Sequence, residues 1–570
     1  MGDSLLITWN LPDLVLTFSS DKVGTTDFST SEETRCLWHA GFIANRIELI
    51  RETGLLRGTP DRDLLLHLYR QYGSRVAQLI FGSFAWVIWD PNLKGLVAVR
   101  DRMGNYGIYY AVREDKVFVS DRIELLLGAL PSQRKLNPRS IIAQICGIPP
   151  LSGETFYEDI KAVEPGGSLA VWCGRTRVDR YWHIEPQPLL RLGSDAEYAD
   201  AFRDLLFKIV AEYIPQHPIA ITLSGGIDST AVAAAIRAVA PSTRLVAFSL
   251  VAPELPEADE DYYSALVSNY LGISRVTIRG DLYWTLCAPD GIKTRLSTPD
   301  YGCYTELWEA TYRKVRQLGF ETLFSGISGD HLFGIANHVY PDLLLTGQWG
   351  ELFRQLSHLP SAQVCSLRFI RGELLGPIVR TYIMRRRKAV SPCAWLAKGC
   401  YEQYYEYFAL PAPLPMMLPG RQMRLDILRH RRINHIAETM NLEAGENRIE
   451  FRHPLLDHRL MEFAVSLPTM QTYRTGIHKV ILRNAMRDYL PDEVVSLGAK
   501  IYPGAIADRG LKERAQSKIW GLLTNMRATA LGFIDETRLQ ETYRSYLVGE
   551  HTDASFWYTV TLEDWLRRYF

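Results

Sequence analysis

The pattern of hydrophobic and polar positions changes near residue 190 and divides the chain into two predicted parts. Before it, aromatic and β-branched residues form short runs between Gly and Asn turns, at 81–90, 94–102 and 107–112. A helical pattern at 61–73 is interspersed among them. We expect this part to be an α+β sandwich, in which the turn at 100–107 is a hairpin loop between two of its strands.

The second part alternates short apolar runs with helical patterns. A segment with two prolines and no clear period, 185–195, precedes it as a linker. The apolar runs, read as strands, are 218–223, 245–250, 275–278 and 322–326. Such βα alternation predicts a parallel, doubly wound sheet, whose ligands collect at the carboxyl ends of the strands. The stretch 335–445 is mostly helical in pattern.

Charge and cysteine usage exclude several classes of function. Basic and acidic residues number 64 each, so the net charge is zero and gives no attraction to nucleic acid or an anionic membrane. The eight cysteines form no CxxC pair, which favours reduced thiols. No apolar stretch approaches the roughly 18 residues needed to span a bilayer. We therefore expect a cytoplasmic protein that binds neither nucleic acid nor membrane.

One polar turn stands between a buried strand and a strongly helical segment. Residues 223–230 read LSGGIDST, and AVAAAIRAVA follows. Glycines let the backbone approach an oxyanion, the hydroxyls add donors, and a helix N-terminus favours negative charge. The chain has no GxxxxGK[ST] loop, so this is not a Walker site. The alternative is an ordinary turn that caps the helix without binding a ligand. The full SGGxDS pattern disfavours this alternative.

This turn resembles the pyrophosphate loop of the ATP-pyrophosphatase superfamily, and the whole chain resembles asparagine synthetase. The segments 324–334, 449–468 and 476–491 are similar to later motifs of that family, and 41–50 and 81–110 to its glutaminase domain. The resemblance implies an N-terminal, glutaminase-like αββα sandwich of the Ntn type at 1–185. It also implies an α/β doubly wound ATP-pyrophosphatase (PP-loop) synthetase domain with many helices at 195–570.

The resemblance also implies a reaction and a set of residues. Enzymes of this family activate a carboxylate as an acyl-adenylate and release pyrophosphate, using ATP and Mg²⁺. The pyrophosphate would be held by Ser224, Gly225, Gly226 and Ser229. The backbone near Leu223, Leu250, Ser325 and Gly326 would contact adenosine. Mg²⁺ would bind Asp228 and Asp330, and Lys479 and Lys500 would neutralise phosphate charge. Lys500 would also stabilise the oxyanion. Simpler roles, as helix caps for the aspartates and surface charges for the lysines, remain open.

Two departures from the family pattern bear on the activity. A glutaminase of this kind needs a cysteine after the initiator methionine, and this chain has Gly2. We therefore expect an inactive amidotransferase-like domain. Ile327 stands where asparagine synthetase has a glutamate, so the general base is open; His331 and Tyr340 are nearby in the sequence.

Without a glutaminase nucleophile, the amine must come from elsewhere, and an amine within the substrate is the natural source. The best-matching member of the family is the lasso peptide cyclase, a macrolactam synthetase that adenylates an Asp or Glu side chain of a precursor peptide for attack by the peptide's N-terminal amine. Its expected partners are that precursor, a leader-binding protein and a leader peptidase. The alternatives are a β-lactam synthetase-like or ammonia-dependent asparagine synthetase-like enzyme, or a non-catalytic scaffold.

Overall fold

The computed structural model describes most of the chain. The described residues are 4–10, 15–20, 24–28, 34–113, 116–130, 134–173, 175–286, 295–334, 338–382, 387–388, 393–404, 409–410, 414, 417–498 and 504–570. Gly2 and Lys500, both singled out from the sequence, lie outside this part of the chain.

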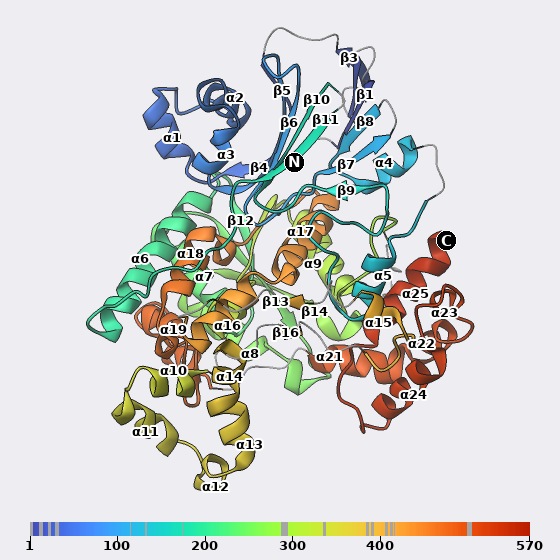
Figure 1. The fold of residues 1–570 in the computed structure, drawn as a ribbon. Helices are drawn as coiled ribbons and strands as arrows, with labels where there is room; N and C mark the ends of the chain where they lie inside the picture. Colours follow the sequence, from blue (N-terminus) through green and yellow to red (C-terminus); the bar gives the residue numbers. More distant parts are fainter. Residues whose placement is uncertain are drawn as a thin grey trace.

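The N-terminal half contains two antiparallel sheets. The first has the order β3-β2-β1-β8-β7-β9 and the second the order β11-β10-β6-β5-β4 (Figure 1). The first comprises β1 (Leu5–Asn10), β2 (Val15–Ser20), β3 (Gly24–Phe28), β7 (Tyr109–Arg113), β8 (Lys116–Ser120) and β9 (Lys161–Ala162). The second comprises β4 (Arg35–Ile43), β5 (Gly82–Asp90), β6 (Gly95–Arg100), β10 (Gly167–Trp172) and β11 (Arg175–Arg180).

Both faces of each of these two sheets are covered by other parts of the chain. Alternate residues such as Val87, Ala98 and Val119 form the core between the sheets. Trp86 and Val99 point the other way, into a cluster with α1 (Arg46–Thr53), α2 (Asp61–Tyr72) and α3 (Val76–Leu79). The remaining face packs on α4 (Ile123–Ala129) and α5 (Pro138–Ile145). The α+β sandwich and the helix at 61–73 are confirmed.

The predicted hairpin at 100–107 is wrong. β6 pairs with β5 and β10 in one sheet, whereas β7 pairs with β8 and β9 in the other. The segment between them therefore crosses from sheet to sheet. The buried Asp101 carboxylate directs this crossing by accepting the backbone N–H groups of Met103, Gly104 and Asn105, each at 2.9 Å.

A buried ion pair joins this crossing to the C-terminal half. The guanidinium of Arg100 lies 2.8 Å from a carboxylate oxygen of Glu438, and the Tyr109 hydroxyl donates to the other oxygen at 2.6 Å. Burial alone would raise the pKa of Glu438, but Arg100 brings it below its usual value. The arginine also donates to the Val163 and Gly104 carbonyls. The pair thus ties both halves together.

Replacing Glu438 with glutamine should lower the free energy of unfolding by about 1.5–3 kcal/mol, because the buried Arg100 loses a charged hydrogen-bond partner, whereas the Asp101 carboxylate stays nearby. Urea denaturation measures this loss. Asp200→Asn, which breaks the surface pair with Arg203, is the control and should change stability by about 1 kcal/mol or less. Equal stabilities of the two variants would contradict the interpretation.

The C-terminal half is built on a parallel sheet with the order β14-β13-β12-β15-β18. Its strands are β12 (Ile219–Thr222), β13 (Leu245–Val251), β14 (Ser274–Arg279), β15 (Thr322–Phe324) and β18 (Glu450–Arg452). The doubly wound sheet is confirmed, with β18 as a strand that the sequence analysis missed. The strand order reverses between β12 and β15, which is where such sheets bind ligands.

Helices cover both faces of this sheet. One face packs on α6 (Asp195–Tyr213), α7 (Ile227–Val239), α18 (His458–Ser466) and α19 (Val480–Met486). The other packs on α9 (Thr305–Gln317) and α17 (Arg431–Glu446). The remaining helices are α8 (Asp261–Tyr270), α10 (Val339–Leu345), α11 (Trp349–Ser357), α12 (Ser361–Val364), α13 (Leu367–Phe369), α14 (Gly376–Tyr382), α15 (Cys400–Gln403), α16 (Pro419–Leu428), α20 (Asp492–Val495), α21 (Gly504–Arg509), α22 (Gln516–Leu522), α23 (Arg527–Ala530), α24 (Glu536–Leu547) and α25 (Trp557–Tyr569).

Two short antiparallel ribbons complete the fold. They are β16 (Arg387–Lys388) with β17 (Ala409–Leu410), and β19 (Tyr473–Arg474) with β20 (Ile477–His478). The described part of 335–445 is mostly helical, as predicted. Among the described residues, no helix has the length and apolar content needed to cross a membrane.

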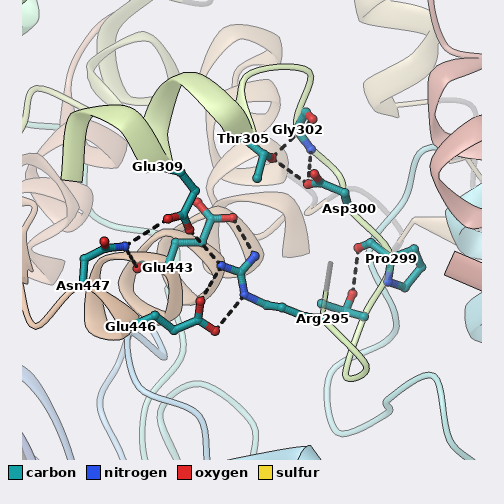
Figure 2. A network of polar contacts seen from close by, with 10 residues as sticks. Arg295, Pro299, Asp300, Gly302, Thr305, Glu309, Glu443, Glu446 and Asn447 are labelled. Carbon is teal, nitrogen blue, oxygen red and sulfur yellow. Dashed lines mark hydrogen bonds and ion pairs between the residues drawn. The ribbon is translucent and has the colours of Figure 1, made fainter. Parts of the chain in front are cut away.

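A buried arginine fixes α9 against α17. Arg295 lies 3.2 Å from Glu309, 3.3 Å from Glu443 and 3.1 Å from Glu446 (Figure 2). Burial raises the pKa of Glu443 to about 8 despite this arginine. On the same stretch of chain, Asp300 accepts the Thr305 hydroxyl at 2.8 Å at the start of α9. This network sets the position of a helix that forms one wall of the site described next.

Candidate active site

A cavity of about 670 Å³ opens at the carboxyl ends of β12, β13 and β15. It therefore lies at the point where the strand order reverses. Of the sequence-predicted residues, the following line it: Leu223, Ser224, Gly225, Gly226, Asp228, Ser229, Leu250, Gly326, Asp330 and Lys479. The structure thus gathers segments that are more than 250 residues apart in the sequence.

The glycine turn is ordered by its own hydroxyl groups. The Gly226 N–H donates to the Ser224 hydroxyl at 3.1 Å, and the Ser224 N–H donates to the Ser229 hydroxyl at 3.0 Å. Gly226 is also the N-cap of α7, so the first amides of this helix lie in the turn. Thr230, which we expected to add a donor, is buried and bonds back to the Gly226 carbonyl at 3.0 Å. The turn and the helix N-terminus together can hold an oxyanion.

Two further glycines bring the second loop against the first. A Cβ atom on Gly326 would lie 2.3 Å from the backbone nitrogen of Ser229. A Cβ atom on Gly329 would lie 2.3 Å from the carboxylate carbon of Asp228. Only glycine permits contacts this close. They place Asp330, which follows Gly329, beside Asp228.

Lys479 lies between the two aspartates. Its Nζ atom is 2.6 Å from Asp228 Oδ2 and 2.7 Å from Asp330 Oδ1, and the residue is 8% exposed. Burial alone would lower the pKa of Lys479, but the two carboxylates raise it above its usual value. The two aspartates converge on one cation here. Two carboxylates and space for phosphate oxygens fit the ligand preference of Mg²⁺.

The wall beyond β13 is apolar. Phe248 and Ile278 from the sheet and Leu307 and Trp308 from α9 line it beside Leu250. The sequence analysis missed the two α9 residues, because an amphipathic helix without a motif gives no signal of a ligand. This surface suits a flat aromatic group such as a nucleobase.

Arg483 is a further lining residue that the sequence analysis missed. Its guanidinium donates to the carbonyls of His478, Val495 and Leu497 at 2.7, 2.5 and 2.8 Å. It therefore fixes the backbone next to Lys479. The motif at 476–491 contains this arginine, so a signal was present.

Several other sequence-derived candidates lie away from this cavity. Ser325 is fully buried, and its hydroxyl shares a 2.7 Å hydrogen bond with His453 Nδ1 instead of lining the cavity. Tyr340 packs on Phe369 and bonds to Thr475 at 3.1 Å. The stability of the protein should depend on pH through the contact between Ser325 and His453, because the His453 imidazole is buried.

As the pH falls from 6.5 to 4, the buried histidines should lower the stability of the protein, whereas carboxyl groups such as Glu443, whose pKa burial raises to about 8, act in the opposite direction. Burial lowers the pKa of His453 to about 3, and burial likewise lowers the pKa of His430, His435 and His458 to about 4. In this window the unfolded chain binds protons that the folded chain does not, so each histidine costs about 1.4 kcal/mol per pH unit. Denaturation midpoints measured across the window check this, and His453→Gln should reduce the slope. A slope that this variant leaves unchanged would contradict the contribution of His453.

The glycine turn, the paired aspartates and the parallel sheet define a nucleotide-binding α/β protein with an amidotransferase-type sandwich in front. Comparison with family models agrees: the asparagine synthase model matches residues 201–567, and the glutamine amidotransferase domain model matches residues 20–182. The chain belongs to the asparagine synthase family. It is therefore an ATP-dependent, amide-forming ligase, of a family that in general uses Mg²⁺.

Curated relatives extend over most of the chain. Amidase chry2 of Gibberella zeae is 24% identical over 541 residues, covering 85% of this chain and 78% of the relative. Amidase chyE of Penicillium rubens is 23% identical over 547 residues, with the same two coverages, 85% and 78%. The glutamine-hydrolysing asparagine synthetase 3 of Bacillus subtilis is 27% identical over 180 residues, 31% of this chain and 29% of the relative.

Proposed function

We propose that this protein adenylates a carboxylate and joins it to an amine, releasing pyrophosphate and then AMP. The observation that carries the proposal is the convergence of Asp228, Asp330 and Lys479 at the glycine turn. Such a cluster suits a polyphosphate chain broken between its α and β phosphorus atoms, because the leaving pyrophosphate needs both anion donors and positive charge.

Each residue then has a physical task. The amides at the start of α7 and the hydroxyls of Ser224 and Ser229 bind the departing pyrophosphate. Asp228 and Asp330 would hold Mg²⁺, which when bound neutralises phosphate charge. Lys479, which lies between the two aspartates, shares that task, and Arg483 keeps its backbone in place. The apolar wall of α9 orients the nucleobase of ATP and excludes water from the α phosphorus atom.

We further propose that the carboxylate is an Asp or Glu side chain of a precursor peptide and that the amine is the N-terminus of the same peptide. The product would be a macrolactam, as made by a lasso peptide cyclase. The support is Gly2 in place of a glutaminase cysteine, and Ile327 in place of the family glutamate. Binding both groups in one molecule makes the attack unimolecular. A leader-binding protein and a leader peptidase would supply the substrate in the cytoplasm.

A small-molecule amide ligase is the second candidate. Two relatives that cover 85% of this chain are named amidases, and neither name mentions a peptide. Such an enzyme would use ammonia, as an asparagine synthetase does without glutamine, or close a β-lactam.

Exchange of labelled pyrophosphate into ATP tests the proposal. We expect exchange that depends on a peptide with an internal Asp or Glu. When the N-terminus of the peptide is free, loss of one water from the peptide and release of AMP should follow. Exchange with aspartate or a small β-amino acid alone would favour the second candidate. Formation of ADP, or no exchange with any acid, would refute adenylation itself.

A further inference from the structure

The structure contains a second cavity, of about 770 Å³, and one of its lining residues directly follows a lining residue of the first cavity in the sequence. Asp330 lines the first cavity and His331 lines the second, and both belong to one π-helical turn, Asp330–Gly334. Consecutive Cα atoms are about 3.8 Å apart. A molecule in the second cavity therefore lies close to the phosphate-side wall of the first.

Five regions of the chain build the second cavity. Residues 146–148 follow α5 in the N-terminal half, 423–433 belong to α16, α17 and their connection, and 553–558 lie at and just before the start of α25. Cys303 and His331 complete the lining. Gly147 is required where they meet, because a Cβ atom there would lie 2.5 Å from the Tyr558 ring. Arg432 donates to the Gly147 carbonyl at 2.5 Å. Both halves of the protein are needed to form this cavity.

The lining of the second cavity suits an amine with apolar neighbours. Most of the apolar lining comes from Ile148, Met423, Ile427, Ile433, Trp557 and Tyr558. Asp426 and Asp553 add two carboxylates, and Arg432, which donates to the Gly147 carbonyl, adds one positive charge. Asp426 accepts the Gln422 side-chain amide at 2.7 Å, and Asp553 accepts the Ser555 hydroxyl at 2.9 Å. Burial lowers the pKa of His430 to about 4, so this imidazole is neutral at pH 7. The charge of the lining is thus negative on balance and favours an ammonium group over a carboxylate.

We propose that the second cavity binds the amine-bearing N-terminal segment of the peptide whose carboxylate is activated in the first cavity. This inference rests on the proposed function. The volume is in the range of about 300–1,000 Å³ that holds ligands of several residues' size, and far exceeds what ammonia needs. In the reaction, the bound ammonium first loses one proton to solvent, and the neutral amine then forms the new C–N bond with the acyl carbon. The C–O bond to AMP breaks, AMP keeps the electron pair, and the second amine proton also passes to solvent.

The test compares two peptides in the pyrophosphate exchange assay. One has a free N-terminus and an internal Glu; the other is the same peptide with its N-terminal segment removed and an acetyl cap. The wild type should show a KM about tenfold lower for the longer peptide, the effect of burying one or two apolar groups. Met423→Trp, which narrows the cavity, should weaken this preference and leave the KM of ATP and of the shorter peptide unchanged.

Controls separate this inference from the proposed function. Val548→Trp alters a residue that is 72% exposed and lines neither cavity, so it should keep the preference. Ala554→Trp narrows the second cavity from a loop and replaces Met423→Trp in the test if that variant misfolds. Equal KM values for the two peptides in the wild type, or a preference that the narrowing variants leave unchanged, would overturn the inference while adenylation stands. Absence of exchange with either peptide would refute the proposed function itself.

Discussion

Replacement of Lys479 with methionine should reduce pyrophosphate exchange by about 10²–10³, the usual effect of losing one charge-stabilising donor at a reacting centre. Lys479 Nζ lies within 2.7 Å of both aspartates, so its removal leaves two carboxylates facing each other in a mostly buried site. The variant loses the positive charge opposite the phosphates and gains repulsion between the aspartates. Initial exchange rates at saturating ATP measure the effect.

Two comparison variants make this prediction specific. Lys208→Met removes an exposed lysine of α6 and should leave the rate unchanged. Lys479→Arg keeps the charge and should recover part of the lost rate. A rate for Lys479→Met within threefold of the wild type would show that this lysine is merely structural.

Replacement of Asp228 with asparagine should reduce exchange by about 10³, which is the upper end of effects seen when a charged group is removed from a preorganised site. The substitution preserves the shape that Gly329 packs against, so the fold should survive. It removes the negative charge that pairs with Lys479 and that, in the proposed function, would bind Mg²⁺. The dependence of the rate on Mg²⁺ concentration should shift to higher concentrations together with the loss of rate.

Asp261 offers the matched control for Asp228. It also lies in the first turn of a helix that follows a parallel strand, but its carboxylate pairs with Arg275 at 2.7 Å. Asp261→Asn should therefore exchange at the wild-type rate. The double variant Asp228→Asn with Lys479→Met should lose less than the sum of the single losses, because the residues act as one unit. Independent, additive effects would argue against a shared cluster.

The sequence predicted the centre of this site better than its surroundings. The turn at 223–230 and the segment 324–334 each carry glycines and an aspartate after a short strand. Because the carboxyl ends of parallel strands lie at the same edge of a sheet, the two segments were expected to come together. What the pattern could not reveal is that Lys479 would bridge both aspartates. That contact depends on the path of about 150 residues between Asp330 and Lys479, which the hydrophobic period does not specify.

The errors have local causes. The segment 100–107 looks like a hairpin turn because strands flank it, and only the pairing partners show that it changes sheets. β18 has three residues, too few for a period, and lies in the segment 449–468, which the sequence analysis treated only as a family motif. Glu450 at its start pairs with Arg452 at 2.6 Å. The second cavity was missed because residues from five separate regions line it without a common motif.

The joint between the two halves has a consequence for how this protein can evolve. Arg100, Tyr109 and Glu438 meet where the halves join, and Gly147 contacts Tyr558. A gene that lost its front portion would produce a ligase in which Glu438 has no arginine partner and the second cavity lacks one wall. Descendants of this protein should therefore keep both portions in a single polypeptide, whatever reaction the front one performs.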